Sequence, residues 1–439
     1  MLSYYLRLAW LSLKRQPGLS SLMVVILAVG LASAMTMLTL YSLAGRNPIP
    51  AKRDTLFAVQ LDALPKDGSW NNDPTLFPTL LSLPDAKAML RSPIPQYQAA
   101  MYSAAMTILP TRPNDSPTRT SVRITTRDFF AMFDAGFRYG GVWDARADQG
   151  MEPVAVLSSA MNDHLFGGEN SVGRKFRMDH IEFTVIGVLE SWHPTPRFYD
   201  PKSSNPFDGT EEVFLPFGIT DSHLEKMEIR GRISSFKTFD NYSEMMHAPD
   251  TVWLQYWAEL KSPADKAVYA DWLNAYAQEQ QKLGRFGHGL GAHLADVDEW
   301  LSLHHVVNDD QRTLLVLAFL FFAICLLNTM GLMLAKFMRK SAELALRRAM
   351  GASGRQLMLQ NLVEGGLIGG LAAALGLLLT GIGLVETRSL FSHYRAIAQL
   401  DPAMLAIGLG IALFGSLGIA LYPAWRTCQV ALAAQLKTQ

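Results

Sequence analysis

The run from Gly168 to Lys175 comes nearest to a nucleotide-binding motif in this sequence. Its glycines have the spacing of a phosphate-binding loop. Such a loop uses a lysine to bind the phosphates and a following Ser or Thr hydroxyl to bind Mg²⁺. Arg174 and Lys175 occupy those two positions here. We therefore expect no nucleotide site in this segment.

Other catalytic and metal-binding patterns are equally weak. The sequence has no His-Glu-x-x-His zinc motif, no nucleophile elbow and no Cys-x-x-Cys pair. Glu244 to His247, with two methionines between them, and the pair His304-His305 could bind a soft metal. Isolated His and Met residues more often serve packing or surface roles. We expect no catalytic residues, no metal site and no cofactor bound by this chain, which argues against a membrane enzyme.

Four long apolar segments dominate the remaining sequence. They cover residues 19–44, 313–335, 365–385 and 402–425, and each reaches the ~20 residues that a helix needs to cross a bilayer. We predict an integral membrane α-helical protein with four transmembrane helices in a 1+3 layout. A large α+β extracytoplasmic domain, residues 45–312, lies between the first and second helices. The spans contain no internal Asp, Glu, Lys, Arg or His, so a proton or ion pathway has no support.

The distribution of basic residues predicts the orientation. Arg7, Lys14 and Arg15 precede the first span, and six Lys or Arg residues lie in the 336–364 link, whereas charges balance in the short 386–401 loop. The positive-inside rule places both termini and the 336–364 link in the cytoplasm of a bacterial cell. The formal net charge is zero, which argues against nucleic-acid binding.

The first 18 residues suggest a helix of their own. Leu2, Leu6, Trp10 and Leu13 recur at helical spacing before Pro17-Gly18, which predicts an amphipathic elbow helix at the membrane surface. A signal peptide cleaved after the 32–34 Ala-Ser-Ala run is the alternative interpretation. The apolar run is longer than the ~7–15 residues of a signal core, so we favour a retained helix. Residues 426–439 form a cytoplasmic tail.

The outer domain has no cysteine, because Cys325 and Cys428 lie in or beside the spans. Its periodicity predicts strands at 55–61, 120–125, 154–157, 183–189 and 251–257. Helices are expected at 83–90 and from Ser262-Pro263 to Leu283, the second ending at Gly284. Pro- and Ser-rich patches at 110–117 and 193–206 predict loops or a boundary between two subdomains.

The link between spans 2 and 3 has the most specific construction. Glu343 and Arg347 form an i, i+4 pair on a predicted helix, and Gly351 can adopt the positive φ that ends it. Ser353 and Gln356 then form a capping box for the next helix. A merely basic membrane loop would explain the charges but not this capped corner, so we favour a docking role.

The same link resembles a known family. The run from Glu343 through the 347–353 sequence Arg-Arg-Ala-Met-Gly-Ala-Ser, followed by Glu364 and a Gly-rich span, is similar to the coupling region of the MacB-like, or FtsX-like, permeases of ABC transporters. Outer segments at 153–158, 165–167, 172–175 and 183–189 resemble the periplasmic core of that family. The implied ATPase-coupling residues are Glu343, Arg347, Arg348, Ala349, Met350, Gly351, Ala352 and Ser353.

The resemblance implies a dimer, with a second copy or a paralogue, whose outer domains move when separate ABC ATPase subunits hydrolyse ATP with Mg²⁺. This mechanism is called mechanotransmission. The expected function is export or extraction of an amphiphile such as a peptide, antibiotic, siderophore or lipoprotein, with a periplasmic adaptor and an outer-membrane channel as further partners. The alternative is a signalling permease that regulates a cell-wall hydrolase. Helix packing, within the chain or at a dimer seam, is expected at Gly365, Gly366, Gly369 and Gly370.

Overall fold

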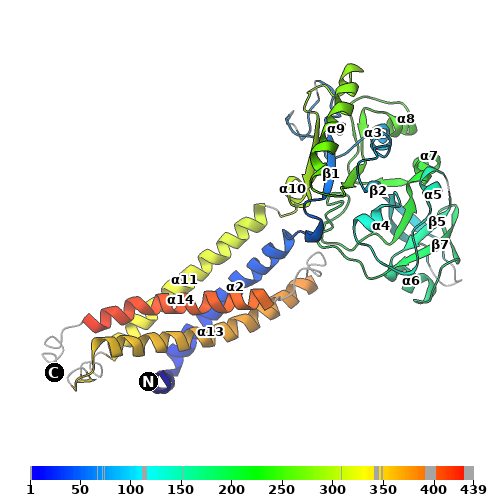
Figure 1. Ribbon diagram of the computed structural model, residues 1–439. Coiled ribbons are helices and arrows are strands. Elements are labelled where there is room, and N and C mark those ends of the chain that lie inside the picture. The colour runs from blue at the N-terminus through cyan, green and yellow to red at the C-terminus, as the bar shows by residue number, and fades with distance from the viewer. Residues whose placement is uncertain are drawn as a thin grey trace. The chain divides into compact units, whose positions relative to one another are not determined.

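A computed structural model describes residues 2–66, 68–71, 73, 75–110, 116–150, 152–307, 309–340, 346–347, 350–390 and 402–429. The chain forms two compact units (Figure 1). One unit contains Met1–Ala44 and Val307–Gln439, and the other contains Gly45–Val306. In the described residues, four helices are long and apolar enough to cross a membrane.

The first unit is a bundle of long helices. They are α1 (Leu2–Arg15), α2 (Pro17–Ala44), α11 (Asp309–Arg339), α13 (Gly354–Leu390) and α14 (Pro402–Gln429). Helix α2 packs against α11 and α13, α14 packs against the same two helices, and α1 lies along α13 (Figure 1). Leu27, Met333, Ile368 and Ala420 are among the residues that fill the interior.

The helices extend beyond the apolar runs that predicted them. The outer unit ends at Val306 rather than at residue 312, because α11 already begins at Asp309. At its other end α11 continues to Arg339, and α13 begins at Gly354. Most of the 336–364 link is therefore helical. Backbone hydrogen bonding does not stop where the side chains become polar, so composition alone made these helices too short.

A helix, α1, is present where the elbow helix was predicted, although a different face packs into the bundle, and its place at a membrane surface stays a prediction. Tyr5, Ala9 and Leu13 are buried, whereas Leu6 and Trp10 are 43% and 47% exposed. Tyr4 and Leu11 are exposed as well. Exposed apolar side chains on one helix suit a position at a membrane surface, where lipid can cover them.

The second unit is built on one mixed sheet of eleven strands. Nine of them follow the order β13-β1-β12-β2-β3-β8-β5-β7-β4. Of the other two, β6 pairs with both β2 and β7, and β9 pairs with β2. The strands are β1 (Leu56–Leu61), β2 (Tyr97–Ile108), β3 (Thr118–Thr125), β4 (Phe137–Gly140), β5 (Val154–Leu157), β6 (Lys175–Met178), β7 (Ile181–Leu189), β8 (Val213–Pro216), β9 (Glu228–Arg230), β12 (Gln255–Glu259) and β13 (Ala292–Asp296). A separate pair joins β10 (Ser234–Ser235) to β11 (Thr251–Val252).

Helices surround the sheet, and all of them except α9 are short (Figure 1). They are α3 (Leu83–Met89), α4 (Phe129–Met132), α5 (Ala145–Gln149), α6 (Ser159–Phe166), α7 (Thr220–His223), α8 (Tyr242–His247), α9 (Asp265–Lys282) and α10 (Val297–Leu303). Three 3₁₀ turns are η1 (Pro50–Lys52), η2 (Phe217–Ile219) and η3 (Leu224–Lys226). The two subdomains expected from the sequence share the eleven-stranded sheet.

Each strand and helix predicted for the outer domain has a counterpart in the structure, although one strand is split in two and other elements were missed. The predicted 251–257 strand is split into β11 and β12, because the amides of Trp253 and Leu254 both donate to the carbonyl of Leu81. Several strands were not predicted, among them the central strand β2. It contains four alanines and no β-branched residue before Thr107, so its composition does not favour a strand. Pairing with neighbours on both sides stabilises it there.

The segment from Gly168 to Lys175 connects α6 to β6. Gly168 and Gly173 have φ values of +82° and +85°, which suit tight turns. Arg174 pairs with Glu169, and Lys175 pairs with Glu182. Turn geometry therefore accounts for the glycine spacing.

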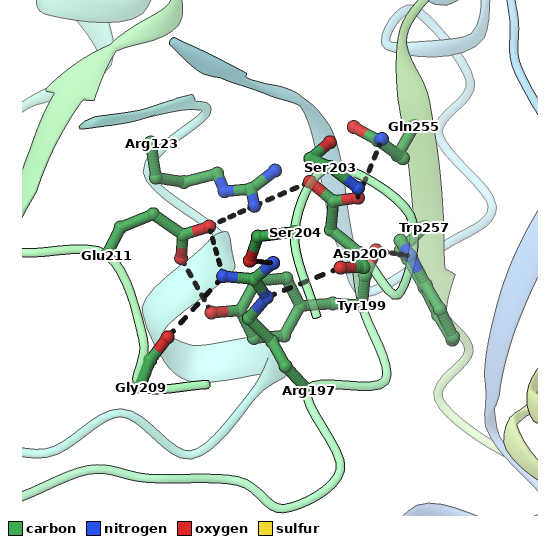
Figure 2. A network of polar contacts seen from close by, with 10 residues as sticks. All are labelled: Arg123, Arg197, Tyr199, Asp200, Ser203, Ser204, Gly209, Glu211, Gln255 and Trp257. Carbon is green, nitrogen blue, oxygen red and sulfur yellow. Dashed lines mark hydrogen bonds and ion pairs between the residues drawn. The ribbon is translucent and has the colours of Figure 1, made fainter. Parts of the chain in front are cut away.

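The 193–206 segment is a loop, as predicted, but part of it is buried inside the unit. Arg197 pairs with Glu211, and Arg123 on β3 pairs with both Glu211 and Asp200 (Figure 2). Burial alone would raise the carboxyl pKa values of Asp200 and Glu211. The positive charges of Arg123 and Arg197 outweigh this effect, so both pKa values lie below their ordinary range. These four charges fix the loop against the sheet. The other predicted loop, 110–117, lies largely outside the described residues.

Candidate functional site

The corner between α11 and α13 contains the predicted docking residues. Its described residues are 346–347 and 350–353. Gly351 has a φ of +99°, and the Ala352 amide donates to the Arg347 carbonyl at 3.1 Å. This is the hydrogen bond of a Schellman motif, which ends a helix at a left-handed glycine. The predicted positive φ at Gly351 is confirmed.

A capping box starts the next helix. The Ser353 amide donates to Oε1 of Gln356 at 3.0 Å, and the Gln356 amide donates to Oγ of Ser353 at 3.3 Å. The predicted capping box is confirmed. The side chain of Arg347 donates to Oε1 of Gln360 on α13 at 3.2 Å, which braces the corner against that helix. Glu343, Arg348 and Ala349 lie outside the described residues.

The corner exposes an apolar surface. Leu346 is 61% exposed and Met350 is 73% exposed, four positions apart in the sequence. Arg347 lies between them, and Arg355 follows at the start of α13. Exposed apolar side chains surrounded by basic residues are typical of a protein docking surface. We call Leu346, Arg347 and Met350 the corner patch.

A buried ion cluster lies where α2 and α13 begin and α11 ends. Nζ of Lys336 on α11 lies 2.8 Å from Oε1 of Glu364 on α13, with both side chains almost fully buried. Nζ of Lys340 lies 3.0 Å from the other carboxylate oxygen. Ser12 of α1 donates to Glu364 at 2.6 Å, and Lys336 donates to Ser20 of α2 at 2.9 Å.

This cluster connects four helices around one carboxylate. Lys340 is the last described residue before the corner, and Glu364 lies on the helix that leaves it. Both ends of the link are therefore attached to the same buried charge. Charge-assisted hydrogen bonds in a low-dielectric interior hold their partners in a defined geometry. The cluster therefore ties both ends of the corner to α1, α2 and α11.

The four glycines at the start of the third span occupy two different environments. A β-carbon on Gly365 would overlap Ala420 of α14, and one on Gly369 would overlap Ser416. These two glycines therefore allow close packing within the chain. A β-carbon on Gly366 would make an ordinary contact with Leu417, and one on Gly370 would meet nothing within 4 Å.

The candidate metal residues are not gathered into a site. In the part of the chain that the structure describes, no group of three or more His, Cys, Asp or Glu side chains could hold a metal ion. His247 Nδ1 bonds the Ser243 carbonyl at 2.8 Å, and His304 Nδ1 bonds the Trp300 carbonyl at 3.0 Å.

Sequence reasoning missed the roles of Lys336, Lys340 and Ser12. The lysines were counted only as charges that orient the protein. Helical periodicity offered a stronger signal, because Lys336 shares one helix face with the apolar Met333 and Phe337. In the structure all three side chains are buried. Glu364 likewise lies in phase with the buried Leu357, Asn361 and Ile368.

Comparisons with known proteins agree with this architecture. The MacB-like periplasmic core domain family matches residues 20–276, and the FtsX-like permease C-terminal family matches residues 315–431. A macrolide export ATP-binding/permease protein MacB from Syntrophobacter fumaroxidans is 22% identical over 70% of this chain and 46% of its own length. The MacB of Wolinella succinogenes is 23% identical over 94% of this chain and 58% of its own length.

The chain thus spans about half the length of the curated relatives it matches. Among solved structures, the periplasmic region of MacB from Actinobacillus actinomycetemcomitans matches 58% of this chain and 95% of its own, at 11% identity and a TM-score of 0.37. The first family match covers more than half of the chain, and the second covers the last three membrane helices. This chain therefore belongs to the MacB-like and FtsX-like family of ABC transporter permeases.

Proposed function

We propose that this chain couples ATP hydrolysis by separate ABC ATPase subunits to movement of its outer domain, and so exports or extracts an amphiphilic substrate. The observation that carries the proposal is the capped corner, which presents exposed Leu346 and Met350 and is attached at both ends to Glu364. A rigid, partly apolar surface of this kind suits a partner that delivers force.

The membrane helices support movement of substrate outside the bilayer. Residues 313–335 and 365–385 contain no Asp, Glu, Lys, Arg or His, and the ion cluster lies at one end of the bundle. A charged substrate would therefore find no polar path through these helices. The same proposal places both termini and the corner in the cytoplasm, the outer domain in the periplasm, and ATP and Mg²⁺ in the partner.

A dimer of permeases, each with its own ATPase, is part of the proposal. Two outer domains would enclose a substrate between them, and an adaptor with an outer-membrane channel would carry it onward. Regulation of a cell-wall hydrolase would need the same coupling but no transported substrate.

The test is co-purification from the native host in mild detergent, followed by ATPase assays of the reconstituted complex in nanodiscs. We expect an ABC ATPase at a one-to-one ratio, whose retention falls at least tenfold with Met350→Glu. Leu283→Glu is the matched control, because Leu283 of the outer domain is 74% exposed and Met350 is 73% exposed. Recovery of the chain without an ATPase, or equal retention by both variants, would refute the proposal. A co-purifying adaptor favours export, whereas a co-purifying hydrolase favours regulation.

A further inference from the structure

Helix α1 presents basic and aromatic side chains on the side that the bundle leaves uncovered. Ala9 and Leu13 lie on its buried side, and α1 packs along α13. Arg7, Trp10 and Lys14 are exposed, and their spacing of three and then four residues puts them on one side of the helix. We call these three residues the basic stripe.

No carboxylate on α1 neutralises the basic stripe. The helix contains neither Asp nor Glu, and the first acidic residue of the whole sequence is Asp54. Nζ of Lys14 lies 5.5 Å from the centre of the Trp10 ring. This cation–π contact positions the ammonium group beside the ring but leaves its charge uncompensated. The stripe therefore offers two positive charges to an anionic partner.

The buried ion cluster beside α1 adds to the positive charge. Ser12 of α1 donates to Glu364, and this carboxylate is shared by Lys336 and Lys340. Two lysines and one carboxylate leave one positive charge in excess, and Lys340 is 19% exposed. A group of like charges at one place on a surface attracts ions of the opposite sign.

The position of α1 in the chain brings the basic stripe to a membrane boundary. Only Gln16 separates α1 from α2, which is long and apolar enough to cross a membrane. The exposed Leu6 and Leu11 flank the stripe on its two sides. Apolar side chains beside basic ones allow a helix to lie in the interface, with the apolar groups toward the acyl chains and the cations at the level of the phosphates.

We propose that the basic stripe binds the phosphate groups of anionic phospholipids. Arg7 and Lys14 pair with the phosphates, and the Trp10 ring lies among the headgroups, where tryptophan is enriched in membrane proteins. An acidic protein surface would match the two charges, but lipid also covers the apolar flanks, Leu6 and Leu11. The proposal goes beyond ATPase coupling and does not depend on it. It rests instead on the position of the helix bundle in a membrane.

The test uses the fluorescence of Trp10 as the reporter of bound lipid. The full chain is placed in nanodiscs of phosphatidylcholine with a minority of phosphatidylglycerol. Bromine quenches tryptophan, and it is carried either by the phosphatidylglycerol or by an equal number of phosphatidylcholine molecules. The Trp10→Phe variant gives the signal of the other tryptophans, which is subtracted. We expect brominated phosphatidylglycerol to quench Trp10 at least about fivefold more strongly, since one basic residue near an anionic surface contributes about that factor.

Three double variants separate charge from folding. Arg7→Gln with Lys14→Gln should remove the preference for phosphatidylglycerol, whereas Arg7→Lys with Lys14→Arg keeps both charges and should keep it. Lys261→Gln with Lys282→Gln is the control for overall charge and should also keep it, because both residues are exposed in the outer domain.

The assay contains no ATPase, so its outcome is independent of the coupling proposal. Equal quenching by the two brominated lipids would overturn the proposal and leave an acidic protein as the partner of the stripe. An absence of Trp10 quenching by either lipid, or an unchanged preference in the glutamine double variant, would overturn it as well.

Discussion

Glu364→Gln is the substitution that tests the ion cluster most directly. It keeps the shape of the side chain but removes the negative charge that Lys336 and Lys340 share. The Lys336 side chain is fully buried, and its remaining hydrogen-bond partner in the described structure is the neutral Ser20 hydroxyl. The variant therefore leaves an ammonium group in the protein interior without a counter-ion.

The expected cost follows from that burial. Removing one partner of a buried ion pair destabilises a protein by about 3–5 kcal/mol, whereas replacing both partners with apolar residues is often nearly neutral. We expect Glu364→Gln to lower the free energy of unfolding by about 3 kcal/mol or more. The double variant Lys336→Met with Glu364→Met removes both buried charges and should be more stable than Glu364→Gln by most of this amount. The remaining charge, on Lys340, costs little because that side chain is 19% exposed and its amine can reach the surface.

The assay is reversible unfolding in mixed detergent and lipid micelles, with ATPase coupling measured on the same samples. Glu386→Gln is the control, since Glu386 lies on the same helix but is exposed, and such changes usually stay within about 0.5 kcal/mol. A loss below about 1 kcal/mol for Glu364→Gln would show that the cluster is not held as described. A double variant no more stable than the single one would contradict the explanation from the unpaired charge.

Three further substitutions test other features. Gly351→Val should reduce ATPase coupling by at least tenfold without impairing membrane insertion, because a β-branched residue is strained at a φ of +99°. Gly354→Ala is the control, and equal coupling of the two variants would refute the role of the Gly351 turn in coupling. Gly365→Leu should unfold the bundle at lower denaturant than Gly370→Leu, because only the first would overlap α14, and equal midpoints would argue against this packing. Burial lowers the pKa of His304 to about 4, below its ordinary 6.5, so the unfolded state binds more protons between these values. The contribution of His304 to the free energy of unfolding should therefore fall by up to about 3 kcal/mol as the pH drops from 6.5 to 4, at about 1.4 kcal/mol per pKa unit. His304→Gln should lose less stability than the wild type over this range, and identical pH profiles of the two proteins would contradict the reasoning.

Features that depend on local sequence were predicted well. Twenty or more apolar residues in a row require a membrane helix, because an unpaired backbone in lipid is too costly. The Gly351 turn and the Ser353 capping box were likewise predicted, since each is formed by residues close together in the chain. The helix ends were harder to predict, because side-chain polarity changes before the backbone hydrogen bonding ends.

Only the tertiary structure revealed which distant residues share one buried environment. Ser12 and Glu364 are 352 positions apart, and the bond between them depends on how α1 packs along α13. The strand β2 forms because neighbours pair with it on both sides, despite its alanine-rich composition. Long-range packing determines these arrangements, and local propensity and periodicity carry no information about which segments will meet.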